Sequence, residues 1–550
     1  MDLIKMQITT ILKSTNNMKY LSFLIAATLL IVVSGCGKTS TPAPVPPVVP
    51  PVVIPPVTDT FPGPTYPDNY ISIAGWESRS QWNLANVHDP TVTKSGDYYY
   101  MYQTDASYGN ALDGHGHYPY RRSKDLVHWD FMGTAFTSVP AWVKDSLNNK
   151  RARMVPALPA IDNPSYGYWA PCIRKVGSKY RLYYCVVVLD PIVGTDYNTS
   201  WSERAFIGWA ESDDLATNVW TDKGMVVCSE PDGLESYIRK GGSDWNAYFK
   251  FNAIDPSFII TPEGEHWLIY GSWHTGIAAL KLNATTGKPD KLENINDYGV
   301  RIAGRGNIGN NRWQALEAPE IIYNETTGYY YLFMAYDELS VAYNTRVARS
   351  RNITGPYLGM DGGNVTTGAE CWPIVTHPYA FNNHTGWVGI SHCAVFQNPD
   401  TKEWFYASQG RLPKDVPGIN ASNALMMGQV RGIQWTEDGW PVVMPERYAA
   451  VPKSTITEQS LVGNWEQITL QYQYQMIQHS ASVVLTADKK VSGSVTGGWS
   501  FDAAKNLLDI NGNKYIVTDA WDWEAATRKV TLTYAGLTAS GVSIWAKKLR

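Results

Sequence analysis

The chain has 550 residues, of which 44% are hydrophobic and 17% charged, and its formal net charge is −4. This balance excludes a protein that binds nucleic acid by electrostatics, and the length suffices for two or three domains. The 22 Trp and 34 Tyr residues exceed the usual needs of a core. Such rings pack β-sheets together and also stack on sugars or bases.

The first 36 residues predict a secretory signal. Lys13 and Lys19 precede the run 21–33, which is uncharged and too short to span a membrane as a helix. The run ends in Val-Ser-Gly-Cys, which resembles a bacterial lipobox, so we expect cleavage before Cys36 and lipidation of that residue. Plain secretion with an incidental cysteine is the alternative.

Residues 37–70 predict a tether. Eleven prolines lie between Pro42 and Pro67, interleaved with valine. A polyproline-type segment has no core of its own and extends by about 3.1 Å per residue. Anchored at Cys36, it would hold the rest of the chain away from a membrane. We therefore expect a bacterial outer membrane lipoprotein, either on the cell surface or facing the periplasm.

A repeated unit organises residues 71–452. Each copy has an X-Pro step, an apolar strand, a polar turn and an aromatic strand. The prolines of the first four copies are Pro90, Pro171, Pro256 and Pro319. A fifth copy, at 391–406, lacks the proline. Long, self-similar all-β units are typical of a propeller with one unit per blade, so we predict a five-bladed β-propeller.

Acidic residues recur at this step. The matching positions of the blades are Asp89, Asp255, Glu317 and, in the fifth copy, His392. In a propeller these positions point at one axial channel. The segment 316–334 predicts a β-hairpin that aims Glu317 into that channel. Glu320 is the rival acid, but strand alternation would point it to the opposite face from Glu317.

The repeats stop near residue 452, and residues 453–550 predict a separate small β-barrel or sandwich. Strand-like stretches continue there, for example at 530–534. The chain contains no Gly-rich phosphate loop before a helix, no Gly-x-Ser-x-Gly and no His-Glu-x-x-His motif. Cys172 and Cys185 flank the turn of the second unit, and a disulfide between them is left open.

Five segments together resemble glycoside hydrolase family 43, in particular its two-domain endo-1,5-α-L-arabinanases. They are His88-Asp89-Pro90, Trp169-Ala170-Pro171, Asn252 to Pro256, Gly271-Ser272-Trp273 with Gly276-Ile277, and Leu316 to Pro319. The resemblance covers residues from about 80 to 550. It implies an active site at one end of the propeller channel and inverting hydrolysis of internal α-1,5-L-arabinofuranosidic bonds in arabinan. We expect a monomer.

The resemblance also implies roles for the three acids. Asp89 is expected to be the general base that activates water, and Glu317 the general acid that protonates the leaving oxygen. Asp255 is expected to orient the acid and to raise its pKa. This chemistry needs one carboxyl group neutral and its partner charged near the working pH, and a neighbouring negative charge disfavours ionisation.

Further residues are expected to bind substrate or metal. His392 resembles a histidine that helps to hold calcium in the channel, largely through water, and a buried core histidine is the alternative. Trp169 and Trp273 are candidate sugar platforms, with core packing as the alternative. His88 and Asn252 belong to the motifs above and are expected to contact the substrate.

Three other functions remain open from the sequence. The first is an exo-acting arabinofuranosidase or xylosidase of the same family, and the second is a non-catalytic glycan-binding propeller. The third is a retaining fructan hydrolase, whose Asn-Asp-Pro-Asn and Arg-Asp-Pro steps fit poorly with Val-His-Asp-Pro-Thr at 87–91 and Ala-Ile-Asp-Pro at 253–256.

Overall fold

The computed structural model describes residues 61–105, 115–154, 157–190, 204–230, 249–306, 315–381, 383–414 and 425–549. The predicted signal with Cys36 and most of the predicted tether lie outside the described residues. The chain divides into a first unit, Met1–Thr58, and a second, Asp59–Arg550, which holds every described element. No helix within the described ranges is long and apolar enough to cross a membrane.

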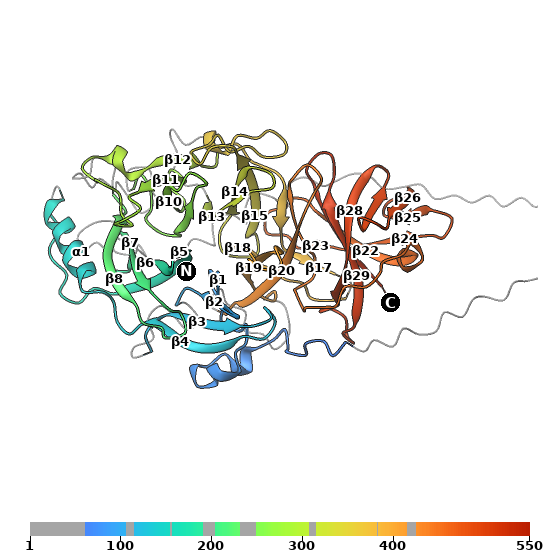
Figure 1. Ribbon diagram of the computed structural model, residues 1–550, viewed down its shortest axis with the longest axis horizontal. Helices are drawn as coiled ribbons and strands as arrows, with labels where there is room; N and C mark the ends of the chain where they lie inside the picture. Colours follow the sequence, from blue (N-terminus) through green and yellow to red (C-terminus); the bar gives the residue numbers. More distant parts are fainter. Residues whose placement is uncertain are drawn as a thin grey trace, which may run out of the picture. The chain divides into compact units, whose positions relative to one another are not determined.

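Five four-stranded antiparallel sheets follow one another in the described chain, each pairing its strands in sequence order (Figure 1). Blade one is β1 (Thr91–Ser95), β2 (Tyr98–Tyr102), β3 (His117–Ser123) and β4 (Asp130–Phe136). Blade two is β5 (Tyr166–Val176), β6 (Lys179–Val188), β7 (Ala205–Ser212) and β8 (Thr221–Cys228). Blade three is β9 (Ser257–Ile260), β10 (His266–Tyr270), β11 (Ile277–Leu282) and β12 (Val300–Ala303). Blade four is β13 (Leu316–Asn324), β14 (Tyr329–Tyr336), β15 (Asn344–Ser350) and β16 (Ile374–Thr376), and blade five is β18 (Ala394–Gln397), β19 (Trp404–Gly410), β20 (Met427–Trp435) and β21 (Pro441–Val443).

Within the described residues, short helices lie before β1 and between some of the later strands. One α-helix, α1 (Trp142–Arg153), lies between blades one and two in the sequence. The 3-10 helices are η1 (Ile71–Ile73), η2 (Trp76–Gln81), η3 (Ile295–Tyr298) and η4 (Val365–Thr367).

The first strands of the five blades form a closed ring. β1 packs against β5 and β18, β9 packs against β5 and β13, and β13 packs against β18. The chain seals the ring between blades five and one, where the N–H of Gly428 donates to the carbonyl of Leu84 at 2.7 Å. The N–H of Val87 likewise donates to the carbonyl of Met426 at 3.3 Å. This arrangement confirms the five-bladed propeller.

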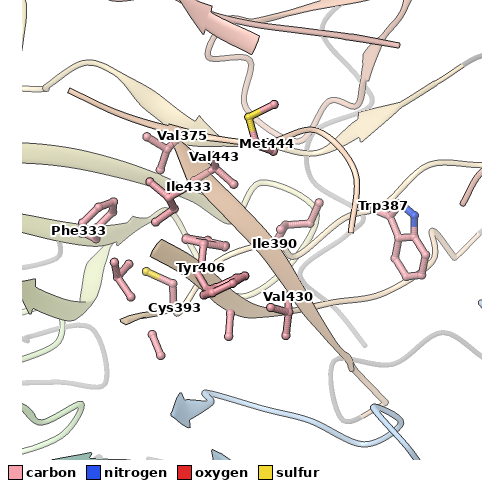
Figure 2. Packing of buried hydrophobic residues seen from close by; sticks show 14 of the residues in the cluster. Phe333, Val375, Trp387, Ile390, Cys393, Tyr406, Val430, Ile433, Val443 and Met444 are labelled. Atoms are coloured by element: carbon pink, nitrogen blue, oxygen red, sulfur yellow. The ribbon is translucent and has the colours of Figure 1, made fainter. Parts of the chain in front are cut away.

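Apolar side chains on alternate strand positions fill the space between blades. Figure 2 shows one such cluster, in which Phe333 of β14, Tyr406 of β19 and Ile433 of β20 approach one another. Phe333 and Tyr406 are fully buried. Burial of apolar area contributes roughly 25 cal/mol per Å², so the aromatic second strands stabilise the contacts between blades.

The C-terminal region is a closed eight-stranded barrel, which confirms the predicted small β-domain. Helix α2 (Glu458–Leu461) precedes it. Its strands are β22 (Gly463–Leu470), β24 (Ala481–Leu485), β25 (Lys490–Gly493), β26 (Gly497–Asp502), β27 (Leu507–Ile510), β28 (Asn513–Trp521), β29 (Val530–Leu537) and β30 (Ser543–Lys548). Pairing of β22 with β30 closes the barrel, and side chains such as Trp465 and Tyr534 fill it.

The barrel is attached to blades four and five. β17 (Tyr379–Ala380) pairs in parallel with β23 (Gln478–His479), which follows β22. The indole N–H of Trp545 in β30 donates to the carbonyl of Val443 in β21 at 2.7 Å. The ammonium of Lys547 is buried in this contact and meets three carboxylates, those of Glu446, Asp522 and Glu524, at 2.7–2.9 Å.

The open question of a disulfide in blade two is answered by the strand register. Cys185 lies opposite Trp169 on β5, whereas Cys172 lies opposite Tyr183 on β6. Cys172 packs with Tyr183 and Phe258, and Cys185 packs with Val187 and Ile254. Both thiols are free and buried, so the two cysteines are not bridged.

Candidate active site

At the start of four blades, a residue with a left-handed backbone stands at, or directly after, a predicted site residue. Asp89, Asp255 and His392 have φ of +45°, +54° and +52°, and Ala318, directly after Glu317, has φ of +53°. This left-handed conformation costs about 1–2 kcal/mol for a residue other than glycine. Strain of this kind is typical of functional sites, where it sets the direction of a side chain. The repeat of one turn in four blades brings these side chains to the same end of the ring.

Asp89 is held by three neighbours. Its Oδ2 accepts a hydrogen bond from the hydroxyl of Thr104 at 2.5 Å, and its Oδ1 lies 2.9 Å from Nδ1 of His392. Its backbone N–H donates to Oε1 of Gln409 at 2.6 Å. Burial alone would raise the pKa of Asp89, but the charge and hydrogen bond of His392, with smaller contributions from His88 and Thr104, lower it to about 2. Asp89 is therefore ionised at any ordinary pH.

Glu317 receives three donors. The hydroxyl of Ser272 and the indole N–H of Trp273 each donate to Oε2 at 2.9 Å. The hydroxyl of Tyr343 donates to Oε1 at 2.6 Å. Ser272 and Trp273 come from blade three and Tyr343 from the β14–β15 connection, so two blades fix the direction of this carboxyl group.

Asp255 and His392 complete the electrostatics of the site. Burial raises the pKa of Asp255, the charge of His392 opposes this, and the carboxylates of Glu317 and Asp89 add to the rise, giving about 7. Burial lowers the pKa of His392, but Asp89, Asp255 and Glu317 raise it to about 9. Oδ2 of Asp255 accepts the N–H of Ala318 at 3.1 Å and so touches the residue beside Glu317. Three carboxyl groups gathered around one imidazole in a largely buried site lead one of them, Asp255, to keep a proton near neutral pH.

The predicted substrate contacts lie at the same end of the ring, with different exposure. Trp169 is half-buried beside Cys185, and Trp273 is half-buried and hydrogen-bonded to Glu317. His88 and Asn252 are buried, and Oδ1 of Asn252 accepts the hydroxyl of Ser229 at 2.9 Å. A contact between these four residues and a substrate stays a prediction.

Glu320 does not lie on the face of the sheet that strand alternation predicted. A β-bulge separates Glu317 from Glu320, which pair with Ala335 and Phe333 respectively. Ala335 and Phe333 are two residues apart on β14, so Glu317 and Glu320 lie on the same face of the sheet rather than on opposite faces. The prediction that alternation separates them was wrong, because it assumed a regular strand.

The same bulge moves Pro319 into the strand instead of its first position. Pro171 likewise lies within a bulge in blade two, whereas β1 and β9 begin directly after Pro90 and Pro256. A bulge leaves a residue without a ladder partner, which tolerates the missing N–H of proline.

Glu320 sits one layer below Glu317 and ties the blades together. Arg174 Nη2 donates to both of its oxygens, at 2.6 and 2.7 Å. The hydroxyl of Ser257 and the N–H of Val395 donate to the same carboxylate at 2.6 and 3.0 Å. Arg174 also reaches the hydroxyl of Thr91 at 3.3 Å. First strands of all five blades therefore meet here, and we call Thr91, Arg174, Ser257, Glu320 and Val395 the cross-channel layer.

A cavity of about 800 Å³ opens on the other side of this layer, lined by residues of the same five strands. The cross-channel layer thus lies between this cavity and the end of the ring that holds Asp89 and Glu317. Four hydrogen bonds engage the carboxylate of Glu320, which indicates a structural role for this residue.

Four polar residues of the site received no role from the sequence, namely Thr104, Tyr343, Gln409 and Ser272, the last of which lies in the motif Gly271-Ser272-Trp273. Three of them lie at or just beyond the end of the second strand of a blade. That strand runs antiparallel to the first and therefore ends beside the predicted site residues, which stand at the start of the first strand. Its final polar positions were a usable signal, whereas Tyr343 begins no repeat and leaves no trace in the pattern.

Comparison with known families decides the relationship of the chain. The family "Glycosyl hydrolases family 43" matches residues 84–441, and "C-terminal lipocalin-like domain" matches residues 445–546. The chain belongs to glycosyl hydrolase family 43. A member of this family is a glycosidase, and the acids at the channel mouth are where such chemistry is expected.

Several family 43 relatives match over most of their length. An extracellular endo-alpha-(1->5)-L-arabinanase of Thermotoga petrophila is 27% identical over 85% of this chain and 95% of its own. Extracellular endo-alpha-(1->5)-L-arabinanase 1 of Bacillus subtilis is 30% identical over 52% of this chain and 72% of its own. The crystal structure of an endo-1,5-alpha-L-arabinanase from Thermotoga petrophila superimposes with a TM-score of 0.65 and 25% identity, covering 85% of this chain and 99% of that one.

Proposed function

We propose that this family 43 glycosidase hydrolyses internal α-1,5-L-arabinofuranosidic bonds of arabinan. The observation that carries the proposal is that an ionised Asp89 and Glu317 both lie near Asp255 and His392 at one end of the channel. The full-length similarity to proteins named endo-arabinanases supports the choice of substrate.

The geometry suits an acid and a base with separate tasks. Asp89, with its pKa near 2, is ready to accept a proton from water as the water oxygen attacks the anomeric carbon. Glu317 gives a proton to the glycosidic oxygen as the bond between this oxygen and the anomeric carbon breaks. Asp255 accepts the N–H of Ala318 beside Glu317 and orients the acid, and Glu317 must itself be protonated when the bond breaks.

Product analysis tests the proposal. Linear α-1,5-arabinan should give oligosaccharides of many lengths from the first minutes, and their average length should decrease with time. Release of a single small product from chain ends would establish exo action. The first-formed product should be the β-anomer in proton NMR before mutarotation, because an inverting site places water opposite the leaving group. An initial α-anomer would show that Asp89 is a nucleophile.

We also propose that calcium occupies the channel with His392 as its one protein ligand. Metal-bound histidines usually donate their other ring N–H to a carboxylate, as Nδ1 of His392 can toward Asp89. Nε2 would then bind the ion after losing the proton that the surrounding carboxylates favour, so calcium binding would release a proton. Calcium prefers oxygen ligands, and water would supply the remainder. Within the described ranges, three acidic ligand atoms cluster only at Glu446, Asp522 and Glu524, where Lys547 already lies.

Metal analysis of untreated protein should find about one calcium per chain, and its removal by a chelator should lower the melting temperature. His392→Ala should lose the ion. Protein purified without any bound calcium that is nevertheless fully active would contradict this proposal.

We further propose that the chain is exported and anchored by a lipid on Cys36, as a monomer held by the Pro-rich tether. The lipobox supports this, and the relatives named above are called extracellular. Cys36→Ala should move the protein from the membrane fraction to the soluble fraction. Retention of that variant in the membrane would rule out this anchor.

A further inference from the structure

The connection between β22 and β23 is the part of the barrel that reaches the propeller's catalytic end. Residues 471–477 read Gln-Tyr-Gln-Tyr-Gln-Met-Ile, and we call them the Gln/Tyr loop. Tyr474 and Met476 are 54% and 55% exposed, which is unusual for large apolar side chains. Gln473 and Gln475 are exposed beside them.

The base of the Gln/Tyr loop is fixed close to the catalytic acid. The hydroxyl of Tyr472 donates to Oδ1 of Asp337 at 3.2 Å, and the guanidinium of Arg346 lies 4.7 Å from the centre of its ring. The N–H of Asp337 donates in turn to the carbonyl of Ala315 at 2.9 Å. Ala315 is two residues before Glu317, so the barrel approaches the catalytic mouth through a single intervening residue.

The tip of the loop is hydrogen-bonded to the β14–β15 connection at the same end of the propeller. The hydroxyl of Tyr474 donates to Oε1 of Glu338 at 2.8 Å, and Nε2 of Gln475 reaches Oγ of Ser340 at 3.1 Å. Glu338 and Ser340 belong to the β14–β15 connection, whose Tyr343 donates to Glu317. This connection lies at the catalytic end, because Tyr336 at the end of β14 pairs with Leu316. The hydroxyl of Tyr474 is thus held while more than half of its surface faces solvent.

Docking of the barrel does not account for this exposure. Tyr472 is half-buried between charged groups of the propeller and makes the attachment, while the side chains of Tyr474 and Met476 bury little apolar area. A fixed, exposed ring next to amide side chains is the arrangement that binds sugars, because ring faces pack on C–H groups and amides bond to hydroxyls.

We propose that the Gln/Tyr loop is an outer binding subsite for the polysaccharide, supplied by the C-terminal barrel. Tyr474 stacks on a furanose ring beyond the mouth, with Met476 beside it, and Gln473 and Gln475 bond to sugar hydroxyls. The inference rests on the proposed function, because the ligand is a chain that also occupies the mouth. It gives the barrel a task in substrate binding and none in the chemical step.

Substrate length separates this role from a structural one. A remote contact that is equal in the bound and transition states changes KM and leaves kcat unaltered. Tyr474→Ala should therefore raise KM for linear α-1,5-arabinan about two- to tenfold, the range expected for one aromatic contact. KM for arabinotriose, which is too short to span the mouth and the loop together, should stay unchanged.

Two further variants sharpen the experiment. Tyr474→Phe keeps the ring and loses the bond to Glu338, so its KM for arabinan should stay within about twofold of the original protein's. Val219→Ala is the matched control, since Val219 is 66% exposed in the β7–β8 connection at the opposite end of blade two. It should change neither KM.

The outcomes are distinct from those of the proposed function. A protein that does not cleave arabinan at all sinks the proposed function and this inference with it. A protein that cleaves arabinan, with Tyr474→Ala unchanged on the polymer or equally impaired on both substrates, overturns only the subsite. Equal damage from Tyr474→Phe and Tyr474→Ala, together with a lower melting temperature, would assign the residue to loop anchoring instead.

Discussion

At the scale of single residues, the site depends on different pKa values for chemically similar carboxyl groups. Asp89 pairs with His392 and is held ionised, whereas Asp255 lies among like charges and has its pKa raised to about 7. The sequence placed all of these residues correctly in register, because one turn recurs in each blade. The sequence led us to expect the raised pKa on Glu317, whereas burial and neighbours from other blades raise that of Asp255.

Asp89→Asn and Glu317→Gln should each lower kcat by about 10²- to 10⁴-fold on arabinan, the usual size of a general acid or base contribution. Both substitutions preserve shape, so the fold should be retained, although Asp89→Asn should lower the melting temperature because it leaves His392 without its carboxylate. Steady-state kinetics with thermal unfolding checks this. A variant at Glu317 that retains full activity would remove this residue from the acid role.

Asp255→Asn should become more stable relative to the original protein as the pH rises from about 4 to above 7. The folded state holds a proton on Asp255 up to about pH 7, whereas an unfolded aspartate releases it near pH 3.8. The stability contributed by that proton is present below pH 4 and lost as pH rises through 7, by up to a few kcal/mol. The asparagine lacks this dependence.

Melting temperatures of both proteins at pH 5 and pH 8, measured with a chelator present, check the sign. A difference between them that is constant with pH would mean that Asp255 ionises normally.

At the scale of elements, the repeated unit predicted the hairpins and the blade count but not the bulges. Alternation along a strand is read from one segment, whereas a bulge arises from pairing with its neighbour. For this reason Glu317 and Glu320 were assigned to opposite faces although they share one. As a consequence, the two glutamates differ in their surroundings. Glu317 lies with the predicted site residues, whereas Glu320 is hydrogen-bonded to strands of other blades.

Glu320→Ala should destabilise the propeller by about 3–5 kcal/mol, because it leaves Arg174 and Ser257 without their carboxylate inside the ring. Chemical denaturation monitored by tryptophan fluorescence measures the effect. Glu325→Ala, in the exposed turn of the same hairpin, is the control and should change stability by less than about 0.5 kcal/mol. A normally stable, inactive Glu320→Ala would instead point to a catalytic role.

At the scale of the whole molecule, barrel and propeller share a buried charged contact. Lys547 from β30 meets Glu446 from the propeller and Asp522 and Glu524 from the barrel. The sequence predicted both domains, yet nothing in its pattern indicated this contact. Lysine and acids at strand ends resemble an ordinary solvated surface until the partner domain covers them.

Lys547→Met should destabilise the protein, and the loss should be greater at pH 8 than at pH 5. Without the ammonium, three buried carboxylates repel one another, which raises their pKa values and makes folding favour protonation. Stability is then retained at low pH and lost as pH rises. Lys490→Met, at a lysine whose side chain is 75% exposed, should show neither effect.

The cross-channel layer has a consequence for how a polymer can move. Arg174 and Glu320 are hydrogen-bonded across the channel axis at 2.6 Å, so the channel is closed at this level and does not run through the ring. A glycan cannot be threaded through it from one face to the other. The chain must lie across the mouth, and both halves of a cut strand must depart by the side from which they arrived. The enzyme therefore cannot act processively by sliding the polymer through the channel. Each cleavage begins with a new binding event or with a shift of the polymer along the outer surface.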